Sequence, residues 1–438
     1  MTAVPQLQTA LAALEGIGRS LHAVVTAIPN PPHAETGVLL GMPIAVKDMI
    51  DVAGQPRGNG NPIDMDGPAK TVDAPVITAL RNAGASLFAI STLLEYAAGA
   101  QHPDIPEARN PVDPTRTAGG SSGGSAALVG AGVCPAALGS DTGGSIRLPA
   151  HYCGVVGFKP SYGAVSLDGV QALAPSLDHL GLLTRDVTTA ARVFAVMSGI
   201  EAVPAPAMVR IGILDDQLSD QRLHDDVRVA VQTAIELLRA DGDRFTLVNV
   251  GGTALDLLNE PIEDIILFEA WQVHGAMMTQ DPAHFGAPTA RLLRTAQGVS
   301  EGAYRTALSR KAALLPGALD LLEGVDILVG PAAPFTAPTV SPPIDTPEGQ
   351  VEGLFSSPFN MTGQPAIVIP CGVTIAANGA GPALPVGLQL AARPGADALL
   401  LAAAAMVEQS FAGHLHAHVV SSLVGAPGQP DSLQREVA

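Results

Sequence analysis

Two stretches rich in glycine and serine, separated by an apolar run, most constrain how this chain folds. They lie in residues 117–150, which read TAGGSSGGSAALVGAGVCPAALGSDTGGSIRLPA. Glycine and serine at this density usually form flexible linkers. A linker does not need to run directly into a stretch such as SAALVGAGV, which suits a buried helix over residues 123–133. We therefore expect both stretches to be ordered loops that hold a buried segment between them.

The second stretch predicts a site for a developing negative charge. In SDTGGSIRLPA, Ser145 follows two glycines, and backbone N–H groups there approach a ligand with no Cβ in the way. This arrangement suits an oxyanion hole. The helix expected after the first stretch would likewise direct its N-terminal amides toward the loop before it.

A lysine is the candidate base for a serine nucleophile, which is weak at its ordinary pKa. His151 is the histidine nearest to the second stretch, but no histidine stands in a motif that suggests pairing with a serine. Lys47 ends the apolar run MPIAV, where burial lowers the pKa of an amine and lets its neutral form accept a proton. Lys47 is either this base or an ordinary lysine at the end of a strand, and the two serine motifs favour the base.

Composition excludes several classes of partner. The formal net charge of −18 leaves no basic stripe for phosphates, so we expect neither direct nucleic-acid binding nor binding to anionic membranes. The longest apolar run, residues 398–407, is too short to cross a bilayer. Cys134, Cys153 and Cys371 are widely spaced in apolar sequence, which is typical of reduced thiols in a cytoplasmic protein.

Periodicity predicts an α/β protein with one large mixed β-sheet covered by helices on both faces. Length alone leaves the number of domains open, and the last residues, 426–438, are expected to form a polar tail. Residues 41–54 are expected to form a short buried strand that ends in a charged loop, and the other expected strands are 86–92, 209–216, 244–250, 325–334, 365–370 and 384–393. The expected helices are 5–28, 74–82, 123–133, 186–199, 222–240, 260–278, 301–322 and 396–410, and residues 335–360 are expected to form one long loop.

Three ordered motifs, GMPIAVKD, GGSSGGSAALV and DTGGSIRLPA, resemble those of the amidase signature family of serine hydrolases. The resemblance extends through NPVDPTRT, GVVGFKPSYGAVS, SLDHLGLLTR and NMTGQPAIVIPCG, and so covers about residues 40–410. It implies that Ser145 is the nucleophile, Ser121 a bridging serine and Lys47 the base. It also implies a cis peptide at Gly120–Ser121. The resemblance further implies one domain over residues 1–425, in which a core of about 40–200 and a C-terminal part of about 205–410 share the sheet.

The resemblance also implies how the rest of the site is built. The oxyanion hole would consist of the backbone amides of Thr142, Gly143, Gly144 and Ser145, and no metal or organic cofactor is expected. Asp141 and Arg147 are interpreted as a bidentate pair that stiffens the nucleophile loop. The HLHAH run at 414–418 is interpreted as a solvated tail without metal.

By analogy with the family, residues 49–61, 95–101, 167–178 and 355–360 are expected to form the walls of the substrate pocket. The candidate substrate-binding residues are Met49, Arg57, Tyr96, Gly120, Asp178 and Phe359. Arg57 either meets a substrate carboxylate or is an ordinary exposed arginine. Ser122 is interpreted as a loop hydrogen-bonding residue, and Ser125 as part of the first turn of the helix.

These observations predict an amidohydrolase that cleaves the C–N bond of a small carboxamide or urea-derived amide through a seryl acyl-enzyme. The alternative in the same fold is the glutaminase (A) subunit of a tRNA-dependent amidotransferase, which would pass ammonia to a partner. A non-catalytic binding relative is disfavoured because Lys47, Ser121 and Ser145 are all present. The family resemblance is consistent with a homodimer.

Overall fold

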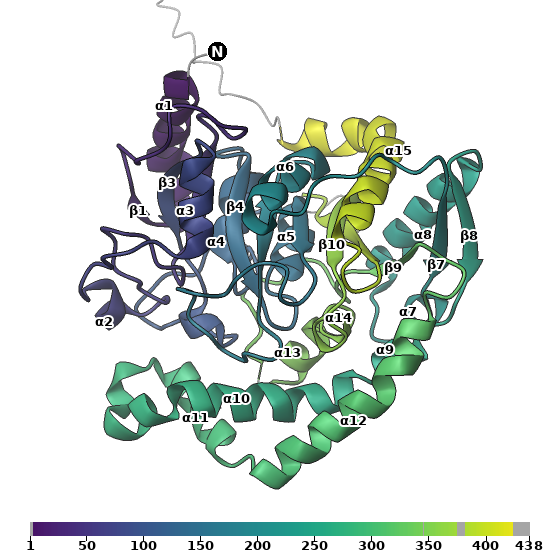
Figure 1. The fold of residues 1–438 in the computed structure, drawn as a ribbon. Helices are drawn as coiled ribbons and strands as arrows, with labels where there is room; N and C mark the ends of the chain where they lie inside the picture. Colours follow the sequence, from purple (N-terminus) through teal and green to yellow (C-terminus); the bar gives the residue numbers. More distant parts are fainter. Residues whose placement is uncertain (1–2, 345, 375–381, 424–438) are drawn as a thin grey trace, which may run out of the picture.

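Eleven strands from both halves of the chain pair into one mixed sheet (Figure 1). The protein is described by a computed structural model over residues 3–344, 346–374 and 382–423. The strands are β1 Val24–Ala27, β2 Pro43–Lys47, β3 Ser86–Ser91, β4 Ala136–Asp141, β5 Val156–Lys159, β6 His179–Thr184, β7 Val209–Ile213, β8 Phe245–Asn249, β9 Ile327–Pro331, β10 Ala366–Val373 and β11 Pro385–Ala391. Their order across the sheet is β1-β3-β2-β4-β6-β5-β10-β11-β9-β7-β8. The predicted mixed sheet is therefore confirmed.

Parallel and antiparallel pairs alternate in blocks along the sheet. Strand β2 runs parallel to both β3 and β4, whereas β4 pairs with β6 and β10 with β11 in the antiparallel sense. At the far edge, β7 is parallel to β8 and β9. Because β2 and β4 lie side by side and run in the same direction, their carboxyl ends meet at one edge of the sheet.

Helices surround the sheet. The α-helices are α1 Ala3–Ala13, α2 Pro62–Met65, α3 Pro75–Asn82, α4 Gly123–Gly130, α5 Arg147–Cys153, α6 Val187–Ser198, α7 Asp215–Leu218, α8 Asp225–Ala240, α9 Thr253–Asp256, α10 Asn259–Gln280, α11 Ala287–Gln297, α12 Glu301–Asp320, α13 Pro347–Glu352, α14 Pro358–Met361 and α15 Asp397–Leu423. A π-helix, Leu14–Gly18, follows α1, and 3₁₀ turns lie at Glu95–Ala97 and Pro282–His284. Helices α10, α11 and α12 form a separate group below the sheet in Figure 1.

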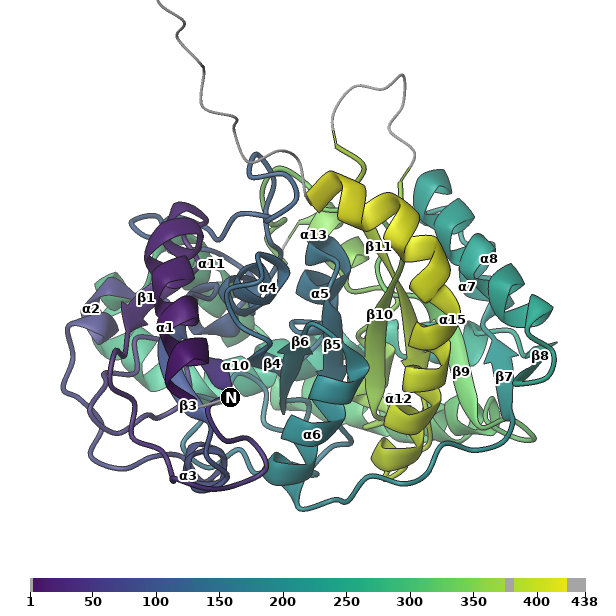
Figure 2. The same cartoon turned by 90° about the horizontal axis from the view of Figure 1, so that it is seen from above.

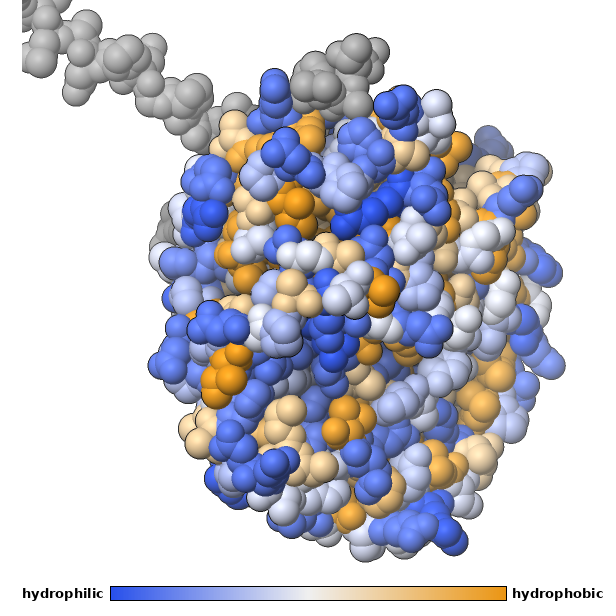
Figure 3. Space-filling view, turned by 60° about the vertical axis from the view of Figure 1, so that its left-hand side comes forward, coloured by the Kyte–Doolittle hydropathy of each residue, from blue (hydrophilic) through white to orange (hydrophobic). Residues whose placement is uncertain are grey.

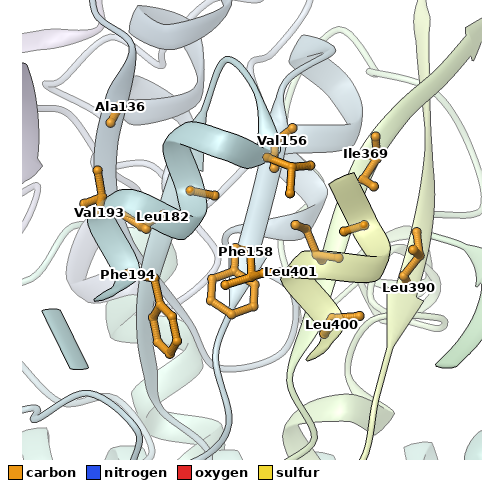
Figure 4. Close-up of a cluster of buried hydrophobic side chains, with 14 of the residues drawn as sticks. Ala136, Val156, Phe158, Leu182, Val193, Phe194, Ile369, Leu390, Leu400 and Leu401 are labelled. Carbon is orange, nitrogen blue, oxygen red and sulfur yellow. The ribbon is translucent and has the colours of Figure 1, made fainter. Parts of the chain in front are cut away.

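Both faces of the sheet are buried, as expected. In β4, Ala136 and Leu138 join the apolar cluster shared with α6 and α15, whereas Ala137 joins the cluster shared with α4 and α5. Figure 4 shows the first cluster, in which Phe194 of α6 and Leu401 of α15 lie against the strands. Figure 2 shows the sheet from above with helices on both sides. On the outside, the face in Figure 3 mixes hydrophilic and hydrophobic residues.

The N-terminal helix is shorter than predicted. The helix expected over 5–28 continues only to Ser20, and the chain then forms β1, which pairs antiparallel with β3. His22 adopts a φ of 54°, a left-handed conformation that ends the helix. The residues that follow, Val24 to Thr26, are β-branched and favour a strand. The helical spacing of apolar residues thus continues beyond the C-terminal end of the helix, so it predicted a helix that is too long.

Several regular elements were missed, and one expected loop is partly helical. Strands β4, β5 and β6 and helices α5 and α11 were not predicted. The loop expected over 335–360 contains α13 and α14. The 414–418 run lies within α15 rather than in a tail, while the tail expected over 426–438 falls outside the described residues. None of the helices described is long and apolar enough to cross a membrane.

Candidate active site

Lys47 lies at the carboxyl end of β2 and is completely buried. Its Nζ donates hydrogen bonds to three serine hydroxyls, at 2.8 Å to Ser121 Oγ, 2.9 Å to Ser122 Oγ and 2.8 Å to Ser140 Oγ. Ser121 and Ser122 belong to the first glycine-rich loop, and Ser140 to β4, the parallel neighbour of β2. The adjoining ends of two parallel strands thus bring the lysine to the serine loop, and the expected pairing of Lys47 with Ser121 is present.

The hydroxyl protons of two of these serines point away from Lys47. Ser122 Oγ donates to the backbone carbonyl of Ser140 (3.2 Å) and accepts from its amide (3.3 Å). Ser140 Oγ donates to the sulfur of Met49 (3.1 Å). Ser121 Oγ has no hydrogen-bond partner besides Lys47 among the described residues. A neutral amine has two N–H donors and one lone pair, so it can donate to Ser122 and Ser140 while its lone pair accepts the proton of Ser121.

Burial lowers the pKa of Lys47 to about 7, although the charges of Asp141 and Asp178 act in the opposite direction. At neutral pH the amine is therefore present in both forms, as a general base requires. This confirms the lowered lysine pKa predicted from the apolar run before it. The neighbouring His151 is a poor base, because burial lowers its pKa to about 4 and its Nδ1 accepts the amide hydrogen of Gly387 (3.0 Å).

A buried ion pair holds the loop that carries Ser145. The Arg147 guanidinium binds both carboxylate oxygens of Asp141, with Nη2 at 2.9 Å from Oδ1 and Nε at 3.0 Å from Oδ2. Its remaining N–H groups donate to Ser356 O (2.6 Å), Gln389 Oε1 (2.8 Å) and Asn360 Oδ1 (2.6 Å). All five donors are used, which confirms the bidentate pair expected from the sequence.

Asp141 remains ionised in this network. Burial alone raises the pKa of its carboxyl, but the charge and hydrogen bonds of Arg147 hold it well below the usual range. Asn360 Nδ2 donates to the same carboxylate (2.9 Å). The ion pair between Asp141, at the end of β4, and Arg147, at the start of α5, therefore joins the two ends of the loop and does not titrate near neutral pH.

The candidate oxyanion amides differ in their partners. The Gly144 amide, one of those expected to face the substrate, donates instead to Asp141 Oδ1 (2.8 Å). In the described part of the chain, the amides of Thr142, Gly143 and Ser145 have no hydrogen-bond acceptor. Gly144 has a φ of +140°, and a Cβ there would lie 2.3 Å from Ser356 Oγ, so the position requires glycine.

A small cavity of about 90 Å³ contains the two serines of the candidate relay. The Gly120–Ser121 peptide beside it is cis, as the family resemblance implies. The Ser122 amide donates to the Ser145 carbonyl (3.2 Å), which ties the two glycine-rich loops together at this cavity. The described lining consists of Leu94, Ala97, Gly99, Gly120, Ser121, Thr142, Gly143, Gly144, Ser145, Leu148, Leu173, Ile266, Pro342, Ile344, Gly349, Glu352 and Gly353. The two serines thus line a cavity whose other walls include residues of α10 and α13.

A larger pocket of about 360 Å³ adjoins this cavity. The two share Gly143, Leu173, Ile266, Ile344, Gly349 and Gly353. The outer pocket is further lined by Ala98, Asn259, Glu260, Ile262, Glu263, Leu267, Leu292, Thr295, Gln350 and Ser357. Half of the side chains that α10 and α11 contribute are apolar, namely Ile262, Ile266, Leu267 and Leu292, so the outer pocket offers an apolar surface beside polar groups.

Only some residues of the predicted pocket walls line the inner cavity or the outer pocket. Gly120 lines the inner cavity, as do Ala97 and Gly99 from the predicted wall at 95–101. Leu173, from the wall at 167–178, lines both spaces. Ser357, from the wall at 355–360, lines the outer pocket. No residue of 49–61 is among the described lining residues.

Two residues expected to bind substrate are engaged elsewhere. Arg57 Nη1 binds Asp51 Oδ1 (3.1 Å) and its Nη2 donates to Gln171 Oε1 (3.0 Å), so its charge is already paired. Met49 is buried and accepts the Ser140 hydroxyl, so it supports the lysine site from behind.

The other three candidates support the walls of the site. Tyr96 is buried, and its hydroxyl donates to Asp64 Oδ2 (2.6 Å). Asp178 accepts the Thr142 hydroxyl (2.6 Å) and holds the loop next to the cavity. Phe359 lies in an apolar cluster. None of the three is among the described residues that line either cavity.

Sequence reasoning missed Ser140, Ile266 and Glu352. Ser140 belongs to the unpredicted strand β4, and Glu352 to the unpredicted helix α13. One local signal for α13 exists, because Thr346 precedes a proline and its hydroxyl caps the Gly349 amide (3.2 Å). In the part of the chain that the structure describes, no group of three His, Cys, Asp or Glu side chains is placed to hold a metal ion.

Comparisons with known proteins agree with this geometry. Residues 25–401 match the family described as Amidase. The A-type subunit of the glutamyl-tRNA(Gln) amidotransferase of Methanospirillum hungatei is 30% identical over 433 residues, covering 90% of this chain and 98% of the relative. A solved amidase structure is 31% identical with a TM-score of 0.81 and covers 94% of this chain and 96% of that one. A vestigial protein complex, solved in work on the origins of an s-triazine catabolic enzyme, is 27% identical with a TM-score of 0.84, covering 94% and 96%.

Proposed function

The chain belongs to the amidase family, and from that premise we propose that it hydrolyses the C–N bond of a small carboxamide or urea-derived amide with Ser145 as nucleophile. The products are an acid and ammonia or an amine. The observation that carries this proposal is the buried contact of 2.8 Å between Lys47 Nζ and Ser121 Oγ, next to a cavity that contains Ser145.

The proton relay follows from the hydrogen bonds around Lys47. Ser145 Oγ attacks the amide carbonyl and passes its proton to Ser121, whose own proton moves to the neutral Lys47 amine. The ammonium that forms has three N–H donors, and Ser121, Ser122 and Ser140 accept all three. Ser122 and Ser140 therefore stabilise the protonated base without competing for its lone pair.

The later steps use the same groups. The carbonyl oxygen develops negative charge within reach of the amides of Thr142, Gly143 and Ser145, which lack other acceptors in the described structure. The Lys47 proton returns through Ser121 to the leaving nitrogen, and the C–N bond breaks to leave a seryl ester. Water then attacks the ester by the same relay and releases the acid.

The pocket favours substrates without negative charge. Glu260, Glu263 and Glu352 are the charged residues among the described lining of the two spaces, and no Lys or Arg occurs there. Arg310 pairs with Glu260 from outside the lining, so a substrate carboxylate would meet the carboxyl groups of Glu263 and Glu352. The inner cavity is small, and the apolar outer pocket takes the larger substituent of the amide.

The second candidate is the glutaminase subunit of a tRNA-dependent amidotransferase. The similarity to the Methanospirillum hungatei amidotransferase favours it, since that relative is matched over nearly its whole length. Ammonia release from a panel of glutamine, aliphatic amides, aryl amides and urea-derived acids separates the two. Hydrolysis of simple amides by the chain alone supports the stand-alone enzyme, and glutamine turnover that requires a partner protein supports the alternative.

Labelling by a serine-reactive fluorophosphonate tests the nucleophile. We expect the folded protein to be labelled and Ser145→Ala to abolish labelling, because the relay activates this hydroxyl. Ser219→Ala, which removes an exposed hydroxyl at the C-terminal end of α7, is the matched control and keeps full labelling. No labelling of the folded wild type would contradict the proposal.

A further inference from the structure

Glu352 is the one ionisable side chain among the described residues that line the inner cavity. It is the last residue of α13, and the same cavity is lined by Ser121 and Ser145. The relay described above uses Lys47, Ser121 and Ser145 and does not involve this carboxylate. An acid beside the reacting bond therefore has no assigned role.

Tyr152, which packs against the first glycine-rich loop, holds the Glu352 carboxylate in place. Tyr152, on α5, donates its hydroxyl to Glu352 Oε1 (2.7 Å). The Tyr152 ring packs against Gly119, where an added Cβ would lie 2.6 Å from the ring. Tyr152 is fully buried and its carbonyl accepts from Asn110 Nδ2 (2.7 Å). Glu352 is thus fixed relative to the loop that carries Ser121.

No cation within the described chain neutralises Glu352. The charge that acts on its carboxyl is another carboxylate, Glu107, and no lysine or arginine of the described residues pairs with it. Burial and Glu107 raise its pKa to about 7, while the hydrogen bond from Tyr152 acts in the opposite direction. A partly buried carboxylate without a counter-ion is destabilised, and a bound cation would relieve this cost.

We propose that Glu352 binds a protonated amine of the substrate, so that the enzyme prefers carboxamides with an ammonium group on the carbon next to the scissile carbonyl. The proposal rests on the function proposed above. An ammonium supplies the missing cation and three N–H donors, of which a carboxylate accepts one or more.

The cavity sets how far the ammonium lies from the carbonyl. A space of about 90 Å³ shared by Ser121, Ser145 and Glu352 holds only a few non-hydrogen atoms. We expect the carbonyl, the leaving nitrogen and one amine-bearing carbon to occupy such a space, and a longer chain between amine and carbonyl to be disfavoured. A side chain on that carbon extends past Ile266 and Leu173 into the outer pocket. The expected substrates are therefore α-amino amides with apolar side chains.

Matched amide pairs test the proposal by exchanging an ammonium for a methyl group of similar size. Alaninamide is compared with isobutyramide, and glycinamide with propionamide, by ammonia release at neutral pH. For the wild type we expect kcat/KM to be at least about tenfold higher for the ammonium member of each pair, mainly through a lower KM. Glu352→Gln should reduce this preference about tenfold or more, while kcat/KM for the neutral amides changes less than about threefold.

Control variants separate recognition from structure. Glu348→Gln removes the same charge from an exposed position of α13 and should keep the wild-type preference. Glu352→Asp retains the charge at a shorter reach and should keep part of the preference. Fluorophosphonate labelling of Ser145 at wild-type rate shows that the Glu352→Gln site is folded.

The outcomes distinguish this proposal from the proposed function. Equal loss of activity on both members of a pair in Glu352→Gln would show that the carboxylate only supports the fold. Wild-type turnover without preference for ammonium substrates would overturn the role of Glu352 and leave the amidase assignment intact. Labelling of Ser145 without turnover of any of these amides would overturn it as well. Absence of both labelling and turnover would refute the amidase itself.

Discussion

The pH dependence of the first chemical step tests the central role of Lys47. Only the neutral amine accepts a proton from Ser121, and burial lowers the pKa of Lys47 to about 7. With this value the neutral fraction is about nine tenths at pH 8, about one half at pH 7 and about one tenth at pH 6. We therefore expect kcat/KM for an uncharged amide to fall about tenfold from pH 8 to pH 6 and to stay level above pH 8.

The assay requires a substrate and a reagent that do not titrate in this range. Isobutyramide hydrolysis and the rate of fluorophosphonate labelling both meet this condition, and they report on the same nucleophile. Glu352 also has a pKa of about 7, so the profile is repeated in Glu352→Gln, where the midpoint should remain. Lys47→Met removes the base, and its rate should be lower by about 10²–10⁴-fold with no titration near pH 7.

Two results would refute this reasoning. One is a profile that rises only toward the ordinary lysine pKa of about 10.4, which would mean that burial does not release the proton. The other is a wild-type profile that is flat across neutral pH while Lys47→Met remains active. Either result would remove Lys47 from the relay and require another base for Ser145.

Three further substitutions test the supports of the site. Ser140→Ala removes one acceptor of the lysine ammonium, so the midpoint of the pH profile should move down and kcat should fall about tenfold, as stopped assays across pH would show. Gly144→Ala places a Cβ 2.3 Å from Ser356 Oγ at a φ of +140°. We expect the free energy of unfolding to fall by about 1–3 kcal/mol and fluorophosphonate labelling to be lost. Normal labelling would contradict the requirement for glycine. Arg147→Lys leaves three donors for the acceptors of five buried hydrogen bonds and should cost about 3 kcal/mol or more in urea unfolding. A loss under about 1 kcal/mol would count against the network.

Strands with strong local patterns were predicted well. The β-branched and apolar runs of β2, β3, β10 and β11 lie within the predicted ranges or overlap them closely. Strand β4 was missed because its sequence, AALGSD, has low strand propensity. Small residues are required in β4 because neighbouring segments pack closely against it. A Cβ on Gly139 would lie 2.9 Å from both Leu183 Cδ1 and Ser122 Oγ. No pattern within the strand records those neighbours.

The candidate site likewise has some features that follow from the local sequence and others that depend on residues distant in sequence. The burial and lowered pKa of Lys47 follow from the apolar run before it, which is a local property. The orientation of the relay depends instead on Ser122 and Ser140, which are 75 and 93 residues from the lysine in sequence. The local sequence left two roles open for Arg57, and one of the two partners that hold its guanidinium, Gln171, lies 114 residues away.

The amino-acid sequence by itself determined where backbone can approach a reacting oxygen and which amine is buried, because glycine content and apolar runs act over a few residues. The tertiary structure alone decided what holds the nucleophile loop, since Arg147 donates to Ser356 and Asn360, which lie 209 and 213 residues away in sequence. It also decided which carboxyl group lines the inner cavity, because Glu352 is held there by the hydroxyl of Tyr152, which is 200 residues away in sequence. Hydrogen bonds and charges act between residues that are close in space, and spacing along the chain does not specify those neighbours.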